Sequence, residues 1–187
     1  MTPAERLVIV DLETTGLNPC RHGILQIARV VLDVPSRRII KGLNRASYVC
    51  PTDHVWSLRD PAAMAVNGLT WEKLSGGRLL NDALSYVLED KIDWSRAVLA
   101  SWGLDFELKF LDAAYTAVGR RPGFPWKGMD VRSWMGFRQA RQRLTDYLNL
   151  KDSARELSLE YNSHDAHDAL YDANLTSQVA LALLEER

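Results

Sequence analysis

Apolar runs separated by polar positions at the start of the chain predict three strands in succession. Residues 7–12 and residues 24–33 are apolar runs of the length expected for buried strands. Residues 34–37 contain Pro and Ser and predict a turn. Residues 38–49 then return as a third strand. We therefore expect an antiparallel meander at the beginning of the chain.

Beyond this region the apolar spacing becomes that of helices. Asp60 before Pro61 is a helix-start signal, because the Asp side chain caps free amides and Pro fits the first turn. Asn67-Gly68 predicts the end of that short helix. Further helices are expected at residues 79–90, 105–118, 132–144, 153–160 and 166–185, and short strands at residues 97–101 and 127–131.

This order of elements predicts an α/β fold. Strands that alternate with helices after an antiparallel start favour a mixed five-stranded sheet, whose first three strands are the meander, flanked by helices. A chain of 187 residues is long enough for one substantial core, so we expect a single domain over residues 1–187.

The composition is that of an ordinary globular protein, with 47% hydrophobic and 25% charged residues. The formal net charge of -1 gives no global positive field, although an acidic metal site can offset a local basic surface. The first residues do not resemble a secretory signal, and no apolar run approaches membrane-spanning length. We expect a soluble, cytoplasmic protein.

Five residues with the chemistry of a metal-dependent hydrolase lie in three separate places: Asp11 and Glu13, Asp105, and His167 and Asp172. Carboxylates gathered from separate elements suit hard divalent cations such as Mg²⁺. A nearby histidine can remove a proton from water near neutral pH. Together these residues predict metal-assisted hydrolysis of a phosphodiester.

Each motif taken alone also has a structural explanation. Asp11 and Glu13 can belong to a surface turn that follows a strand. Asp105 is an acid in the first turn of a helix, where the helix dipole favours negative charge. His167 and Asp172, about 140° apart on an ideal helix, can belong to a solvated acidic helix start.

In combination and in order, the motifs resemble the DEDDh family of 3′-to-5′ exonucleases, the DnaQ-like and RNase T-like enzymes of the ribonuclease H-like superfamily. The resemblance rests on residues 11–17 (DLETTGL), on Asp105 and on residues 167–173 (HDALYDA), with residues 66–70 (VNGLT) between the first two. Histidine at position 167, where a sister branch has tyrosine, selects the DEDDh branch.

The resemblance implies a ribonuclease H-like fold and two Mg²⁺ or Mn²⁺ ions. It implies that Asp11 bridges both ions, and that Glu13 and Asp172 help to hold one of them. Asp105 would hold or orient the second ion through water. His167 would be the general base that activates water against the terminal phosphodiester.

The same segments offer candidates for substrate binding. Thr14, Thr15 and Gly16 are small, so their backbone amides can approach a nucleotide. Leu17 and Phe106 adjoin the predicted metal ligands and are candidates for separating or stacking the terminal bases. Three residues depart from those frequent in the family and bear on substrate preference: Ser101, Gln26 and Asn67.

Basic residues outnumber acids in the segment 120–143, and Trp126, Trp134 and Phe137 lie among them. This segment either grips a phosphate backbone and stacks bases, or is a solvated helix face with its aromatic side chains in the core. For any single residue, the second interpretation is favoured.

These observations predict a 3′-to-5′ exonuclease that releases nucleoside 5′-monophosphates from single-stranded 3′ ends, with DNA slightly favoured. An RNA-trimming exoribonuclease is the alternative within the class, and a nucleic-acid-binding module without turnover is the alternative outside it. The short stretch after Asp172 has no tail for polymerase tethering, so we expect a free-standing nuclease; a homodimer is expected on base rates alone.

Overall fold

The protein, seen in a computed structural model, is described over residues 5–125, 127–141 and 149–186. In these ranges a mixed sheet has the strand order β3-β2-β1-β5-β6, with β4 also paired to β2. The strands are β1 (Arg6–Thr14), β2 (Ile24–Asp33), β3 (Arg38–Ile39), β4 (Arg45–Tyr48), β5 (Ala97–Ser101) and β6 (Met129–Asp130). Because β1 pairs antiparallel with β2 and parallel with β5, it lies at the centre of the sheet.

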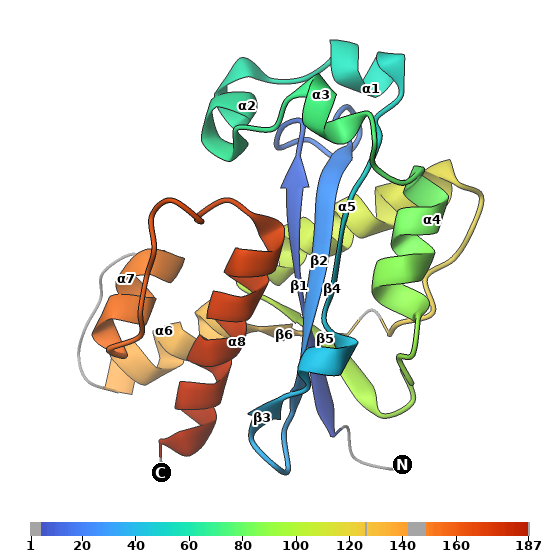
Figure 1. Cartoon of the computed structure of the whole chain (residues 1–187). Coiled ribbons are helices and arrows are strands. Elements are labelled where there is room, and N and C mark those ends of the chain that lie inside the picture. The colour runs from blue at the N-terminus through green and yellow to red at the C-terminus, as the bar shows by residue number, and fades with distance from the viewer. Residues whose placement is uncertain (1–4, 126, 142–148, 187) are drawn as a thin grey trace.

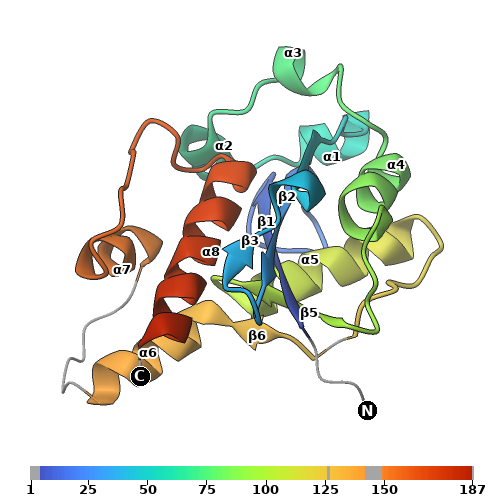
Figure 2. The same ribbon diagram turned by 60° about the horizontal axis from the view of Figure 1, so that its bottom comes forward.

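Helices cover both faces of this sheet and one of its ends (Figures 1 and 2). The helices are α1 (Asp53–Ser57), α2 (Pro61–Asn67), α3 (Trp71–Leu74), α4 (Leu80–Leu84), α5 (Leu104–Ala117), α6 (Val131–Arg141), α7 (Leu150–Glu156) and α8 (Ala169–Glu185). A 3-10 turn, η1 (Lys41–Leu43), lies between β3 and β4, and a π-helical turn, η2 (Ser85–Glu89), continues α4. Figure 1 shows α1, α2 and α3 gathered beyond the end of β1.

The core consists of two layers separated by the sheet. Val8 and Val10 of β1 pack with residues of α4, η2 and α5, whereas Leu7 and Ile9 pack with residues of α6 and α8. Successive residues of a strand point to opposite faces, so a strand covered on both sides needs apolar residues at every position. This explains the unbroken apolar run at the start of the chain.

The predicted antiparallel meander and the helix-covered mixed sheet are confirmed, but the sheet has six strands and not five. The segment 38–49 was expected to be one strand, and η1 divides it into β3 and β4. The backbone N–H of Val31 in β2 donates to the side-chain Oδ1 of Asn44 at 3.2 Å. A side chain thus takes the position of a backbone partner in the ladder, which interrupts the strand.

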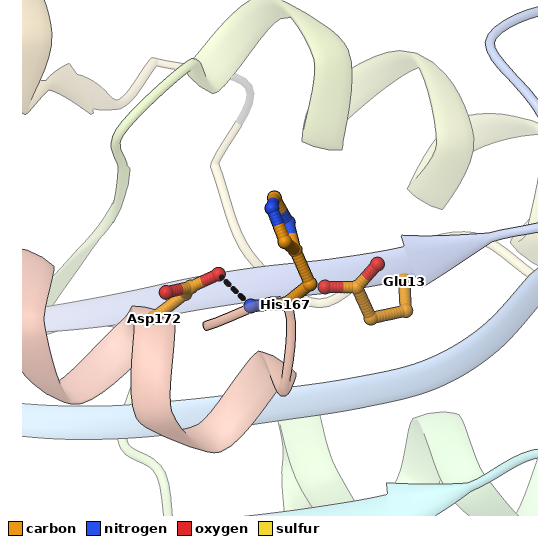
Figure 3. A group of neighbouring side chains, drawn as sticks. All are labelled: Glu13, His167 and Asp172. Carbon is orange, nitrogen blue, oxygen red and sulfur yellow. Dashed lines mark hydrogen bonds between the residues drawn. The ribbon is translucent and has the colours of Figure 1, made fainter. Parts of the chain in front are cut away.

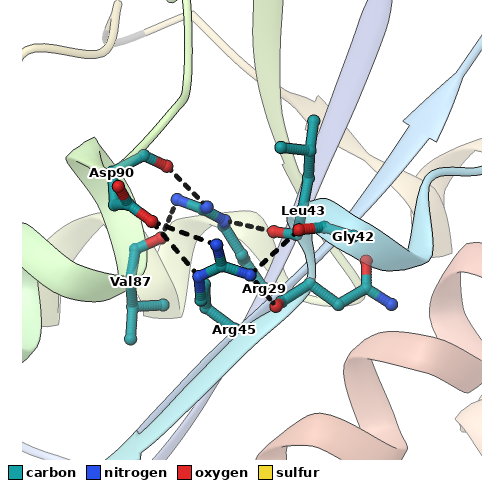
Figure 4. Close-up of polar contacts among 7 residues, drawn as sticks. Arg29, Gly42, Leu43, Arg45, Val87 and Asp90 are labelled. Carbon is teal, nitrogen blue, oxygen red and sulfur yellow. Dashed lines mark hydrogen bonds and ion pairs between the residues drawn. The ribbon is translucent and has the colours of Figure 1, made fainter.

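A buried arginine holds η1 against the sheet (Figure 4). Arg29 of β2 is fully buried. Its guanidinium donates to the carbonyl of Leu43 at 2.8 Å, to that of Asp90 at 2.6 Å and to that of Val87. Burial lowers the pKa of Arg29 to about 10, so it remains charged at neutral pH. One side chain therefore joins β2, η1 and the end of η2.

Each predicted helix has a counterpart among the described residues, and side-chain caps fix the starts of α2 and α7. The side chain of Asp60 accepts from the N–H of Ala62, and α2 ends at Gly68 with φ 63°, as expected. The helix expected over residues 153–160 is α7, which begins earlier because the Asn149 side chain caps the N–H of Asp152.

Part of the predicted basic and aromatic segment has no structural description: Trp126, Arg143 and the end of the helix expected over residues 132–144 lie outside the described residues. The last strand, expected over residues 127–131, is β6, and α6 begins directly after it. Among the described residues, no helix combines the length and apolar character needed to cross a membrane.

Candidate active site

Strand β1 places both of its carboxylates on one face of the sheet. Asp11 lies opposite Ala28 of β2, and Glu13 lies opposite Gln26. Because alternate positions of a strand share a face, both side chains are on the side of the sheet that α8 covers. Both side chains are half-buried.

The start of α8 is fixed by side-chain hydrogen bonds. Asp168 caps the helix, since its Oδ1 accepts from the N–H of Leu170 at 3.0 Å and of Tyr171 at 3.1 Å. Gln26 donates from Nε2 to Oδ2 of Asp168 at 2.8 Å and accepts at Oε1 from the N–H of Ala169 at 3.2 Å. Strand β2 therefore determines where α8 begins.

The last helix, expected over residues 166–185, begins at Ala169, so His167 lies just before α8. Its backbone has φ 65°, a left-handed conformation in which His is more common than most residues other than Gly. Its N–H donates to Oδ2 of Asp172 at 3.0 Å (Figure 3). This bond orients the histidine relative to the helix, and unusual backbone conformations of this kind cluster at functional sites.

Three of the predicted residues converge at this point. Glu13, His167 and Asp172 each offer a ligand atom, and these atoms lie within 4.8 Å of one another. Figure 3 shows His167 drawn between Asp172 and Glu13, with its imidazole rising to one side of the two carboxylates. Two carboxylate oxygens and an imidazole nitrogen at this spacing can hold a divalent cation.

Burial and mutual repulsion make these carboxylates reluctant to ionise. Burial, followed by the charges of Asp172 and Asp168, raises the pKa of Glu13 to about 8. Burial also raises the pKa of Asp11 well above its usual value, helped by the charges of Glu107, Asp172, Glu13 and Asp168. Burial raises the pKa of Asp172 as well. A cation among these groups relieves the repulsion and stabilises their ionised forms.

Asp105 is not part of this cluster. It lies in the first turn of α5 with its side chain 81% exposed, and Lys109 donates to it at 2.5 Å. This is the arrangement of a surface i,i+4 ion pair, which contributes little to stability.

A mainly apolar cavity of about 270 Å³ adjoins Glu13. Thr14, Leu17 and Phe106, all predicted substrate-binding residues, line it together with residues of α2. Leu17 is 78% exposed, so it is free to contact a ligand from solvent. The cavity has the apolar lining that suits a flat aromatic ligand.

The other two predicted binding residues support the loop from within. Thr15 is fully buried, and its Oγ1 accepts from the N–H of Gly23 at 3.0 Å. A Cβ added to Gly16 would lie 2.2 Å from the ring of His22, so a larger residue there would have to displace that ring. Neither residue is among those that line the cavity.

Three residues that hold or surround the site were not among the predicted site residues. Asp168 is the first, and its side chain caps α8. Asn67 donates to the carbonyl of Thr14 at 3.1 Å and so ties α2 to the end of β1. Glu107 was not considered, although an acid on the stripe that includes Phe110 is a signal that helical periodicity provides.

Comparison with known proteins gives concordant results. A model of the exonuclease family (RNase_T) matches residues 8–180. Ribonuclease T of Histophilus somni is 23% identical over 185 residues, which cover 92% of this chain and 80% of that protein. The 3′-5′ DNA exonuclease Cap18 of Escherichia coli is 30% identical over 186 residues, which cover 93% of this chain and 91% of that protein.

A solved structure shares the fold. The nuclease domain of 3′hExo, a DEDDh family member bound to rAMP, superposes with a TM-score of 0.77 at 19% identity. The match covers 97% of this chain and 92% of that one.

Proposed function

Because this chain belongs to the RNase_T family of exonucleases, we propose that it removes nucleotides from the 3′ end of single-stranded DNA and releases nucleoside 5′-monophosphates. The fold is ribonuclease H-like, as expected, and the family depends on divalent metal ions. The observation that carries the proposal is the convergence of Glu13, His167 and Asp172 beside an apolar cavity. The family match over most of the chain supports a single exonuclease domain as the unit that acts.

The residues at this site fit divalent cations. Asp11, Glu13 and Asp172 come from two elements, and burial together with neighbouring carboxylates raises the pKa of each. We assign these three carboxylates to two Mg²⁺ or Mn²⁺ ions, since hard oxygen ligands suit both metals. When bound, such ions stabilise the attacking and leaving oxygens of a phosphodiester.

His167 is assigned the role of general base. Its ring is exposed and lies close to the carboxylates of Glu13 and Asp172, so it can take a proton from the attacking water. The water oxygen bonds to phosphorus as the bond from phosphorus to the 3′ oxygen of the preceding nucleotide breaks. The 3′ oxygen of the shortened strand takes up a proton from solvent and becomes a hydroxyl, and the released nucleotide keeps the 5′ phosphate.

The apolar cavity is assigned to the terminal base. Phe106 and Leu17 offer it an aromatic and an aliphatic surface, and base–aromatic stacking tolerates any sequence. Glu13 lines the same cavity, so a base held there keeps its phosphate near the carboxylate cluster.

We propose DNA and not RNA as the main substrate, and the choice rests on the relative with the higher sequence identity of those described above. The relative at 30% identity is a DNA exonuclease, whereas ribonuclease T matches at 23%. The match to ribonuclease T favours exoribonuclease activity as the second candidate. The two polymers differ at the 2′-hydroxyl, which a protein senses through local contacts.

A digestion time course tests this proposal. The substrates are 5′-labelled single-stranded DNA and RNA of matched sequence, with Mg²⁺, beside an EDTA control and the Asp11→Asn variant. We expect a ladder that shortens from the 3′ end, faster on DNA, and that is lost with EDTA and in the variant. Binding without a ladder on either polymer would favour a binding module instead, and a faster RNA ladder would favour the exoribonuclease.

A further inference from the structure

Helix α5 carries two carboxylates near its start, and they point in different directions. Asp105 and Glu107 are separated by about 200° around an ideal helix. Asp105 faces solvent, with its side chain 81% exposed. Glu107 is 5% exposed and shares the buried stripe of Phe110 and Leu111. Glu107 is therefore the acid of this pair that faces the interior of the molecule.

The buried carboxylate of Glu107 is not fully satisfied. Its Oε2 has no hydrogen-bond partner among the described residues. The hydroxyl of Ser101, at the end of β5, lies beside the carboxylate. Buried polar groups nearly always have partners, so the free oxygen marks a position where a ligand outside the protein chain is expected.

The neighbours of Glu107 are mostly negative. Glu107 lies near enough to Asp11 for its negative charge to raise the pKa of that carboxyl, after the effect of burial. Asp130 is a second acidic neighbour of Glu107, and Arg132 is a basic one. Like charges buried together repel one another unless a cation lies among them. A divalent cation would both supply the missing partner and compensate this charge.

We propose that Glu107, in place of Asp105, is the carboxylate of α5 that holds a divalent cation together with Asp11. This inference rests on the proposed metal-dependent function and names a further ligand of the same site. It departs from the assignment that the sequence motif implied. Asp105 remains a surface residue paired with Lys109.

The affinity of the full chain for Mn²⁺ tests this assignment independently of catalytic activity. It is measured by titration calorimetry and by the electron paramagnetic resonance signal of free Mn²⁺. Glu107→Gln keeps the shape of the side chain and removes its charge, so we expect at least tenfold weaker Mn²⁺ binding. Asp105→Asn should bind within twofold of the parent. Asp112→Asn, which removes an exposed acid from the same helix, is the matched control. Circular dichroism in EDTA checks that each variant folds.

The outcomes separate this inference from the function on which it rests. If Asp11→Asn loses Mn²⁺ binding while Glu107→Gln binds Mn²⁺ like the parent, the role of Glu107 is overturned but the metal site is not. Parental binding in Asp11→Asn would overturn the metal site itself, and weaker binding in Asp105→Asn than in Glu107→Gln would restore the motif assignment. If Glu107→Gln fails to fold, Glu107→Asp takes its place as the test variant, because it keeps the negative charge on a shorter side chain. Parental Mn²⁺ affinity in that variant would contradict a direct ligand.

Discussion

At the scale of single residues, His167 combines an unusual backbone with an exposed ring. Its φ of 65° and its hydrogen bond to Asp172 fix the start of the side chain, while the ring stays accessible beside Glu13. A general base needs this combination, because it must be oriented and must also exchange its proton with solvent.

Replacement of this histidine should separate catalysis from folding. We expect His167→Asn to lower kcat by about 10²- to 10⁴-fold, the usual contribution of a general base, with little change in DNA affinity. Asn tolerates the left-handed backbone, so the thermal stability should stay close to that of the parent. Steady-state kinetics and melting curves measure both quantities, with the exposed His54→Asn as control. A variant with parental kcat would remove His167 from the mechanism.

At the scale of elements, the site depends on how β2 is joined to its neighbours. Gln26 fixes the start of α8, and Arg29 three residues later fixes η1 and the end of η2. Gln26 and Asn67, two of the residues that depart from those frequent in the family, thus have structural roles. Each holds the end of an element that reaches the site.

Arg29 provides a test of this framework away from the site. Arg29→Met removes the donors to three carbonyl groups, and unsatisfied buried acceptors cost about 1–3 kcal/mol each. After partial relaxation we expect the free energy of unfolding to fall by roughly 2–4 kcal/mol, with kcat at low temperature unchanged. Urea denaturation followed by circular dichroism measures the change. Arg38→Met on the exposed edge is the matched control, and an equal loss in both variants would contradict a special role for Arg29.

At the scale of the whole molecule, the acidic site links stability to pH and to metal. The pKa of Glu13 is raised from 4.5 to about 8, and those of Asp11 and Asp172 are also raised. Without metal, the folded chain therefore holds protons that the unfolded chain has already lost between about pH 4.5 and pH 8. Stability in this window falls as the pH rises.

Melting temperatures in EDTA should therefore decrease by roughly 5–10 °C from pH 5.5 to pH 8. Saturating Mg²⁺ should reverse most of this loss at pH 8, because a ligand that binds only the folded chain stabilises it. Glu13→Gln, which cannot ionise, should show a flatter pH dependence in EDTA. A melting temperature that rises with pH in EDTA would be opposite in sign to this expectation.

Much of the fold and most of the site could be predicted from the sequence, because local patterns encode them. A run in which every position is apolar indicates a strand covered on both faces. Asp60 and Gly68 mark the two ends of a helix, and they can be recognised without tertiary information. The order of Asp11, Glu13, His167 and Asp172 along the chain indicated the family.

Only the tertiary structure decided the remaining features, since these depend on contacts distant in sequence. The break in the third strand arises from the contacts of Asn44 and Arg29 with residues of other elements. The rotation of α5 against the sheet decides that Glu107 faces inward and Asp105 outward. A motif specifies which residue types occur and at what spacing, whereas packing determines which carboxylate of α5 is buried and which is exposed.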